Sequence, residues 1–336
     1  RGVFRRVACQ RQAEKNGRRD ASFDFGTNPC SEIILRPYQF CNLSEVVIRA
    51  NDTLESLRLK VRSAAVLGTL QATLTDFRYL RKIWKDNTEE EALLGVSLTG
   101  IMDHPVMSGR KSREELRQWL TQLKEEAIKT NRNWAKRLGI SVSTAITAVK
   151  PSGTVSQLVD SASGIHPRYA EQYIRRVRAD ARDPLCAVLE AAGVPVEMDV
   201  TSPTTKVFSF PIKSPKQAVV ATDMGAMEQL CLWEMYQDHW CEHKPSCTVY
   251  YSDDEFFDVC SWVWKNFNKV SGISFLPRSE HSYRQAPYQP CTEEEYWEAK
   301  SDFPDFDMSH ASEFESGFDS TTSSQELACT GGACEL

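Results

Sequence analysis

The sequence predicts an α/β fold, and three features support this prediction. Short runs of β-branched and aromatic residues alternate with longer runs of helical periodicity, a pattern typical of parallel strands joined by crossover helices. Of the 336 residues, 41% are hydrophobic and 26% are charged, which is enough apolar material for a sizeable core and excludes wholesale disorder. The mean hydropathy is −0.43, and no run of about 18 residues lacks charges, which excludes a membrane-spanning helix.

Three helices are predicted most clearly. Residues 1–20 are polar and basic and predict a solvated helix. Leucine, valine and alanine at helical spacing predict a second helix over residues 53–74. Ser112 and Glu115 form a capping-box pattern before a third helix, which should end at Gly139 because glycine favours a left-handed C-terminal cap.

Shorter elements fill the chain up to residue 276. The predicted strands are residues 94–101, 145–149, 206–212, 247–251 and 273–276, and the predicted helices among them are residues 184–192, 224–241 and 254–269. Beyond about residue 300 the periodicity stops and Ser, Asp, Gly and Thr dominate, which predicts a flexible arm. The sequence therefore divides into a basic lead-in segment (1–25), an α/β body (26–300) and a tail (301–336).

Charge is distributed unevenly between the body and the tail. The net charge is −6, but residues 301–336 carry eight acids and neither lysine nor arginine, so the first 300 residues are nearly neutral. A neutral body is not the polybasic surface that binds nucleic acid. We therefore expect neither a nucleic acid nor a membrane as a partner.

The eleven cysteines do not indicate a secreted disulfide scaffold in a chain of this length. No charged-then-apolar leader is visible, so we expect reduced thiols and a cytoplasmic protein. Cys241 and Cys247 lie near two histidines but span a predicted helix end and strand start, so their side chains should diverge and no metal site is expected. The chain begins with Arg1 rather than methionine, and we expect a processed product, a fragment or one piece of a split protein.

Residues 28–32 are the strongest candidates for chemistry. Pro29 biases Asn28 toward an extended conformation and predicts a turn at the mouth of a strand. Alternate side chains of an extended stretch share one side, so Asn28, Cys30 and Glu32 would converge on one cavity. A thiol beside a general base suits nucleophilic or radical sulfur chemistry. On spacing alone, a buried structural cysteine in a turn remains the simpler alternative.

Motifs along nearly the whole chain resemble a single enzyme family. They are Asn28-Pro-Cys-Ser-Glu-Ile33, Cys41-Asn-Leu-Ser44, Lys150-Pro-Ser-Gly-Thr-Val-Ser156, Gly164-Ile-His-Pro167, Tyr173-Ile-Arg-Arg-Val177, Gly272-Ile-Ser-Phe-Leu-Pro277 and Ala328-Cys-Thr-Gly-Gly-Ala-Cys334. Together they resemble the C-terminal half of ribonucleotide reductases, in particular the monomer-type class II enzymes that use adenosylcobalamin. The resemblance implies the second five-stranded half of a ten-stranded α/β barrel, with a central finger loop and a flexible C-terminal redox tail. The N-terminal half of the same enzyme, as a separate or upstream chain, would then be a partner.

Two positions favour class II over the other classes of the family. The site that resembles the tyrosine relay of the diiron class holds Phe275 and Leu276, which cannot pass on a radical as tyrosines do. Gly331 and Gly332 lie between two cysteines and resemble a hinge rather than a glycyl-radical loop. The expected cofactor is therefore adenosylcobalamin.

The resemblance also implies roles for individual residues. Cys30 would become a thiyl radical and abstract the ribose 3′-hydrogen, and Glu32 would accept the 3′-hydroxyl proton. Asn28 would hydrogen-bond the sugar hydroxyls, and Cys41 would be one of two reducing thiols, its disulfide partner lying upstream of this chain. The substrate would be a ribonucleotide, with the di- or triphosphate left open. Two alternatives remain: an inactive nucleotide-binding assembly or regulatory subunit, and a thiol–disulfide oxidoreductase.

A second candidate site follows the strand predicted at residues 145–149. Small hydroxyl residues with exposed N–H groups at the start of a helix can bind an anion without lysine. An ordinary N-cap is the alternative, although it needs only one such residue. The resemblance favours a site for the substrate phosphates, formed by Pro151, Ser152, Gly153, Thr154, Val155 and Ser156.

Cys329 and Cys334 lie on the acidic tail with two glycines between them. An active-site disulfide must be reduced after each turnover, and thiol exchange requires a thiolate that can reach it. The resemblance implies that this cysteine pair carries electrons to the active site and is itself reduced by thioredoxin or glutaredoxin. A disordered end with incidental cysteines, or a small zinc tail, is the alternative.

Overall fold

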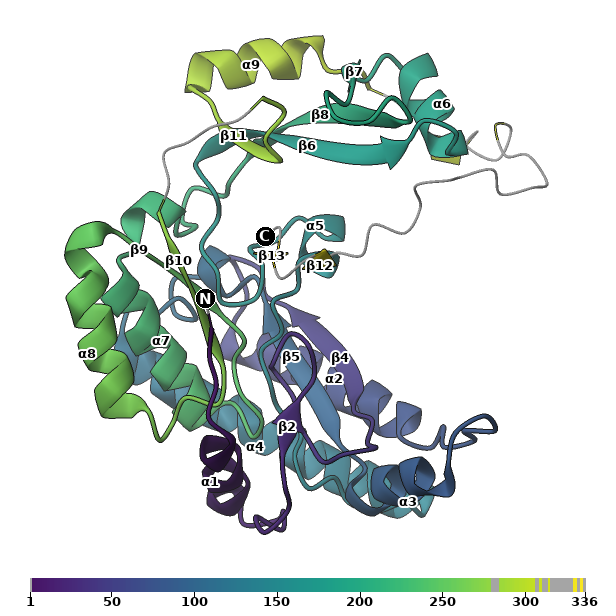
Figure 1. The fold of residues 1–336 in the computed structure, drawn as a ribbon, viewed down its shortest axis with the longest axis vertical. Helices are drawn as coiled ribbons and strands as arrows, with labels where there is room; N and C mark the ends of the chain where they lie inside the picture. Colours follow the sequence, from purple (N-terminus) through teal and green to yellow (C-terminus); the bar gives the residue numbers. More distant parts are fainter. Residues whose placement is uncertain are drawn as a thin grey trace. The chain divides into compact units, whose positions relative to one another are not determined.

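The computed structural model describes residues 2–278 and 284–305, residues 308, 309 and 314, and the backbone of residues 329–330 and 333–334. The chain folds into two compact units (Figure 1). The first unit comprises Arg1–Arg168 and Gln217–Arg278, and the second comprises Tyr169–Lys216 and Ser279–Leu336. The predicted body, residues 26–300, thus contributes to both units.

The first unit is built on parallel strands, as predicted. Strand β4 (Asn42–Val47) pairs in parallel with β5 (Leu94–Thr99). Strand β9 (Thr248–Tyr251) pairs in parallel with β10 (Ile273–Pro277), and the short β1 (Gly2–Val3) adds an antiparallel edge to β10. The strands predicted at residues 94–101, 247–251 and 273–276 are therefore confirmed.

Residues 145–149 connect the two parallel ladders. They are joined to β5 by an isolated parallel bridge at Thr147, and Val149 forms a second such bridge with Pro245 just before β9. Five parallel extended segments therefore follow one another in the order β4, β5, 145–149, 245–251 and β10.

The strand predicted at residues 145–149 is present as an extended segment with isolated bridges rather than as a named strand. The amide of Ile146 donates to the Glu242 carboxylate at 3.0 Å, where a strand would offer a backbone carbonyl. The carbonyl of Thr147 accepts from the amides of both Glu242 and His243. Backbone pairing with β5 is kept all the same, since the amides of Leu94 and Val96 donate to the carbonyls of Ala145 and Ile146, and the Ala148 amide donates to the Val96 carbonyl.

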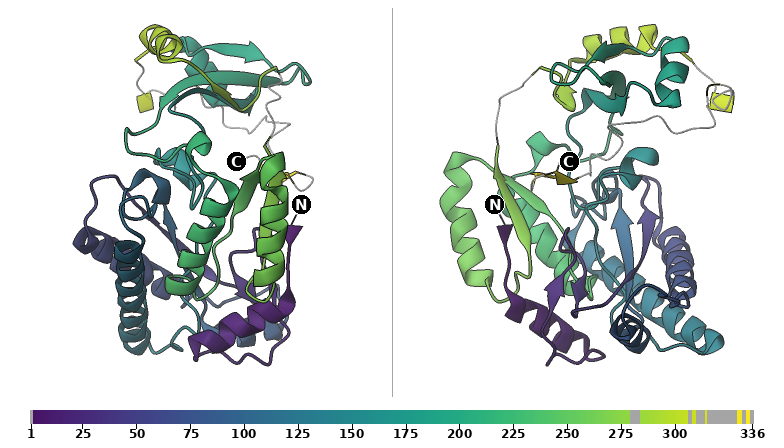
Figure 2. Two further views of the ribbon diagram at one scale, coloured as in Figure 1. Left: turned by 90° about the vertical axis from the view of Figure 1, so that its left-hand side faces the viewer. Right: turned by 45° about the vertical axis from the view of Figure 1, so that its right-hand side comes forward.

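Helices cover this strand layer. In the first unit they are α1 (Arg6–Asn16), α2 (Leu54–Gln71), α3 (Lys82–Glu91), α4 (Arg113–Leu138), α5 (Val155–Leu158), α7 (Ala226–His239) and α8 (Phe256–Asn266). Helix α2 packs on β4, β5 and α4, and α7 packs on β9 and α8 (Figure 2). Among the described residues, no helix combines the length and apolar character needed to cross a membrane.

Local sequence signals set the helix ends. The Thr53 side chain accepts from the Ser56 amide at the start of α2, and the Ser112 hydroxyl accepts from the Glu115 amide at the start of α4. Gly139 ends α4 in the left-handed conformation, as predicted. The helix predicted in the lead-in segment exists as α1 but is not simply solvated, because it buries Cys9 and neighbouring residues.

The second unit is an antiparallel sheet with the strand order β11-β6-β8-β7. Its elements are β6 (Gln172–Asp180), α6 (Pro184–Ala191), β7 (Val196–Met198), β8 (Thr205–Lys213), β11 (Tyr288–Pro290) and α9 (Glu293–Asp302). The strand predicted at residues 206–212 is confirmed as β8, but the expectation of a parallel neighbour is wrong, since β8 pairs antiparallel with β6. Strand β6 was not predicted because its three arginines hide the apolar alternation.

Candidate functional site

A small hairpin carries the first group of candidate residues. Strand β2 (Gly26–Thr27) pairs antiparallel with β3 (Ile34–Leu35), and residues 28–33 form the tip. The Asn28 side-chain oxygen accepts from the Ile33 amide at 3.0 Å, and the Asn28 carbonyl accepts from the Ser31 amide at 2.9 Å. The Asn28 oxygen thus closes the turn, and its NH₂ group is available to donate to another molecule.

The hairpin corrects one expectation. The predicted turn at the mouth of a strand is present, but residues 28–32 are not an extended segment. Pro29 and Cys30 lie in the turn, and Ser31 follows in the left-handed region with φ 64°. One left-handed residue breaks the alternation of side chains, so the shared direction of Asn28, Cys30 and Glu32 cannot be derived from spacing.

Glu32 lies deep in the first unit, with 2% of its surface exposed. Its Oε1 is 3.9 Å from the Nζ of Lys150, and its Oε2 has no hydrogen-bond partner among the described residues. A buried carboxylate oxygen without a partner is costly, and such atoms are commonly completed by a ligand or water. The geometry thus leaves an acceptor for an incoming hydroxyl.

Cys41 shares the surroundings of Glu32. It lies one residue before β4 and is half-buried. Burial raises the pKa of the Cys41 thiol far above its usual range, Glu32 raises it further, and Arg19 and Lys150 act in the opposite direction. No disulfide joins the nine cysteines whose side chains are described.

Gly95 on β5 makes room for Cys41. A Cβ atom at Gly95 would lie 2.4 Å from Leu43 Cδ2, 2.9 Å from Ile33 Cδ1 and 3.5 Å from Cys41 Sγ. The absence of a side chain at this position thus lets β5 approach both the hairpin and Cys41.

Replacing Gly95 with alanine should therefore lower the free energy of unfolding by about 1–3 kcal/mol, because the neighbouring side chains must move. Chemical denaturation of the purified protein measures this change. Gly26→Ala is the matched control, since nothing lies within 4 Å of a Cβ atom there. Equal stability of the two variants would contradict the tight packing.

The candidate phosphate site, residues 151–156, directly follows Lys150, whose Nζ lies 3.9 Å from Glu32 Oε1. Ser152 is in the left-handed region with φ 57°, and its hydroxyl donates to Glu45 Oε2 at 2.6 Å. The helix predicted near Val155 is confirmed as α5, although it has a single turn. Among the described residues, the amides of Gly153 and Thr154 have no hydrogen-bond acceptor.

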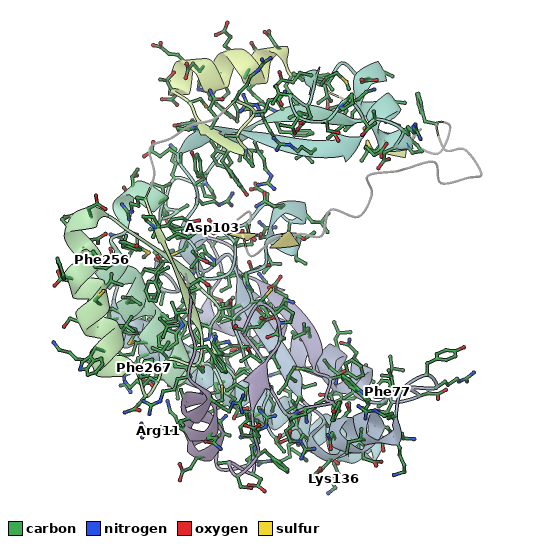
Figure 3. The ribbon with its side chains drawn as sticks, viewed as in Figure 1. Arg11, Phe77, Asp103, Lys136, Phe256 and Phe267 are labelled. Carbon is green, nitrogen blue, oxygen red and sulfur yellow. The ribbon has the colours of Figure 1, made fainter. Side chains whose placement is uncertain are left out.

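The loop after α5 is fixed by a buried ion pair. Arg168 binds Asp103 through two nitrogens, each 2.9 Å from a carboxylate oxygen (Asp103 is labelled in Figure 3). Asp103 also accepts from the amide of Ala162 at 2.8 Å. This ion pair thus fixes residues 162–168, which follow the candidate phosphate site along the chain.

Glu45 is a site residue that the sequence did not indicate. It lies on β4, where burial raises the pKa of its carboxyl and the Ser152 hydroxyl acts in the opposite direction. Its Oε1 has no hydrogen-bond partner among the described residues. A charged residue within the run Asn42–Val47 was the only available signal.

A buried lysine lies behind the hairpin. Lys244 is completely buried, and this burial lowers its pKa to about 8, although Cys9 and Glu32 act in the opposite direction. In the unfolded chain a lysine keeps a pKa of about 10.4, so the unfolded state binds more protons between these two values.

The stability of the wild type relative to Lys244→Met should therefore rise as the pH increases from about 8 to about 10.5. The expected rise is about 3 kcal/mol, because each tenfold change in proton affinity corresponds to about 1.4 kcal/mol. Denaturant unfolding of both proteins at pH 7.5, below the transition, and at pH 10, near its upper end, measures roughly 70% of the full difference. A stability difference that is independent of pH would contradict the lowered pKa of Lys244.

The tail cysteines lie opposite one another in the backbone. Strand β12 (Cys329–Thr330) pairs antiparallel with β13 (Ala333–Cys334), and Cys329 and Cys334 are register partners. Their side chains, and most of the predicted tail 301–336, lie outside the described residues.

Comparison with known proteins finds relatives that share one name, adenosylcobalamin-dependent ribonucleoside-triphosphate reductase. The chain is 27% identical over 345 residues to the protein of Lactobacillus acidophilus, 28% over 344 residues to that of Lactobacillus leichmannii, and 29% over 323 residues to that of Lacticaseibacillus paracasei. These matches cover 93%, 93% and 87% of this chain but 45%, 45% and 42% of the relatives. The chain thus spans less than half the length of these relatives. No protein-family model matches it.

Solved structures give a consistent result. A crystal structure of a B12-dependent class II ribonucleotide reductase matches with a TM-score of 0.72 and 25% identity, over 86% of this chain and 43% of that protein. The Actinobacillus ureae class Id ribonucleotide reductase alpha subunit matches with a TM-score of 0.57 and 11% identity, over 83% of this chain and 58% of that one, which concerns the fold alone. The predicted α/β fold and the predicted resemblance are confirmed.

Proposed function

We propose that this chain is the catalytic C-terminal part of an adenosylcobalamin-dependent ribonucleotide reductase, an enzyme that converts ribonucleotides to 2′-deoxyribonucleotides. The observation that carries the proposal is the site itself, where the Cys30 hairpin, the unpartnered oxygen of Glu32 and the thiol of Cys41 share one neighbourhood. The similarity to reductases over 93% of the chain supports it. The five neighbouring parallel segments of the first unit support the further proposal of a half-barrel around a finger loop at residues 26–35.

Cys30 would start the reaction by abstracting the 3′-hydrogen of the ribose. Its half-buried position at a hairpin tip fits a thiol that must meet both a cofactor and a substrate. When bound, adenosylcobalamin would supply the one-electron oxidation of this thiol. Asn28 would donate from its NH₂ group to a sugar oxygen, because its own oxygen is engaged by Ile33.

Glu32 would take the 3′-hydroxyl proton, and the 2′-hydroxyl would leave as water after accepting a proton from one of the two reducing thiols. Its free Oε2 is the acceptor, and Lys150 lies close enough to stabilise the carboxylate. Cys41 would then supply one of the two thiols that reduce the sugar. Its high pKa keeps it as a protonated thiol that can give up a hydrogen atom.

The substrate phosphates would bind at residues 151–156. The amides of Gly153 and Thr154 point to no acceptor within the described part of the chain, and unpaired amides are what a phosphate requires. Glu45 engages Ser152 and would orient this segment rather than bind the anion.

The complete enzyme would contain a further chain segment. The relatives are more than twice as long as the aligned part, and we propose that their other half, as an upstream or separate chain, supplies the second thiol for Cys41. Thioredoxin or glutaredoxin would renew the thiols in the reducing cytoplasm.

The direct test is to assay this chain alone and together with the N-terminal part, each with adenosylcobalamin, a dithiol and a ribonucleoside di- or triphosphate. Deoxyribonucleotide should form only when both parts are present. No product from the complete protein with any of these substrates would overturn the proposal.

Changing both Cys329 and Cys334 to serine should stop repeated turnover with thioredoxin but spare turnover with a small dithiol. The reason is that thioredoxin is too large to reach a buried disulfide, whereas a small dithiol can diffuse to it. Steady-state rates with each reductant measure the effect, and Cys260→Ser, an exposed cysteine on α8, is the control. Normal turnover of the double variant with thioredoxin would contradict the relay role of the tail.

A further inference from the structure

Residues 243–246 hold the backbone of the Cys30 hairpin at three successive points. The Ser246 hydroxyl donates to the Cys30 carbonyl at 2.5 Å. The Lys244 amide donates to the Glu32 carbonyl at 3.2 Å. The His243 Nδ1 accepts from the Ile34 amide at 3.2 Å. Alternate residues of the hairpin are thus tied to one short segment of the chain.

His243 connects this segment to the parallel strands. It is completely buried, and its Nε2 lies 2.9 Å from the carbonyl of Leu94 at the start of β5. Burial lowers the pKa of His243 to about 3, so the ring is neutral. A neutral ring with Nδ1 as the acceptor carries its proton on Nε2, where it donates to Leu94.

Lys244 anchors the same segment by a second route. Its buried Nζ donates to the carbonyl of Gly272 at 2.6 Å, and it has no ion pair within the described residues. A Cβ atom on Gly272 would lie 2.7 Å from that Nζ and 3.1 Å from the Cβ of Ser31. Gly272 therefore permits both the lysine and the hairpin tip to approach β10.

We propose that residues 243–246 are a positioning element for Cys30, with Lys244 as its buried cationic anchor and Ser246 as its direct contact. A buried ammonium that makes no direct ion pair is expensive and is not needed merely to fill space, although the charge of Glu32 offsets part of the cost. Here it fixes the hairpin against β10 while His243 fixes it against β5. The thiol is then held in one place relative to Glu32. The catalytic consequence rests on the proposed function, whereas the mechanical role does not.

The test compares Ser246→Ala and Lys244→Met with Ser246→Thr, which retains the hydroxyl, in the complete protein. Two control variants change side chains of similar burial or chemistry elsewhere. Ser214→Ala removes a hydroxyl that donates to the Ala170 carbonyl at 2.7 Å, and Lys124→Met removes a half-buried lysine on α4. The measurements are amide hydrogen exchange at Ser31, Ile33 and Ile34, the rate of alkylation of Cys30, and kcat.

Ser246→Ala and Lys244→Met should raise hydrogen exchange in the hairpin about tenfold, the effect of losing one net hydrogen bond, and leave exchange in α4 unchanged. Both should change the alkylation rate of Cys30 and lower kcat. Ser246→Thr keeps the hydroxyl and should match the wild type in hydrogen exchange, alkylation rate and kcat. Unchanged hairpin exchange, or an equal rise in α4, would overturn the positioning role. If the wild type reduced no ribonucleotide but the two variants still raised hydrogen exchange in the hairpin, the positioning role would stand. The proposed function would then be wrong.

Discussion

Replacing Cys30 with serine in the complete enzyme should reduce deoxyribonucleotide formation to the detection limit while the protein stays folded. An alcohol O–H bond is much stronger than a thiol S–H bond, so serine cannot form a comparably stable radical. The fold should survive because serine is close to cysteine in size and keeps the backbone carbonyl that accepts from the Ser246 hydroxyl. Single-turnover assays with adenosylcobalamin measure the product, and circular dichroism and hydrogen exchange in the hairpin measure the fold.

Two further variants make this result specific. Cys260→Ser changes an exposed cysteine on α8 and should leave the yield unchanged. Cys41→Ser should still allow the first hydrogen abstraction, because Cys41 is proposed to act only in the later reduction, but should block the final product. Normal product from Cys30→Ser would exclude the radical role of this thiol.

The sequence was sufficient where the physical signal is local. The helices at residues 53–74 and 112–139 follow from apolar spacing and from caps at Thr53, Ser112 and Gly139, each of which depends on neighbours within a few residues. The parallel strands β5, β9 and β10 were predictable for a similar reason, because short apolar runs between helices are typical of the buried strands of a parallel sheet. The pairing of β6 with β8 was not predictable, because three arginines, two of them adjacent, interrupt the apolar pattern of β6.

The candidate site was only partly predictable, because its polar contacts are long-range. The motif around Cys30 indicated the chemistry, but the left-handed Ser31 invalidates the alternation argument for its side chains. Glu45 meets Ser152 across 107 positions of sequence, and Ser246 meets Cys30 across 216. No local pattern distinguishes such residues from ordinary polar positions, so the structure was needed to find them.

Lys244 shows the same limit in a sharper form. A lysine between a histidine and a proline predicts an exposed turn, because lysines are rarely buried without a partner. Its burial becomes intelligible only with Gly272, whose missing side chain leaves room for the ammonium and whose carbonyl accepts from it. Residues 28 positions apart thus determine whether this lysine can be buried at all.

The second large effect is expected from Glu32→Gln, which should lower kcat about 10²- to 10⁴-fold, the usual contribution of a general base. Glutamine has nearly the same shape, and its amide oxygen can still face Lys150, so the buried site should stay packed. It cannot accept a proton, however, and the unpartnered Oε2 position would hold either a donor or a weaker acceptor. The loss should therefore appear in kcat, with little change in KM, because substrate phosphates are proposed to bind elsewhere, at residues 151–156.

Glu45→Gln is the matched control for this prediction. Glu45 is also a carboxylate with one unpartnered oxygen in the same unit, but its other oxygen accepts from Ser152, and it is proposed to orient residues 151–156 rather than to take a proton. Its amide could still accept from the Ser152 hydroxyl, so kcat should change by less than about tenfold. Steady-state kinetics with saturating cofactor and dithiol, on enzyme of verified folding, measure both variants. If Glu32→Gln kept more than a tenth of the wild-type kcat, or if Glu45→Gln lost as much as Glu32→Gln, proton transfer would have to be assigned to a group other than Glu32.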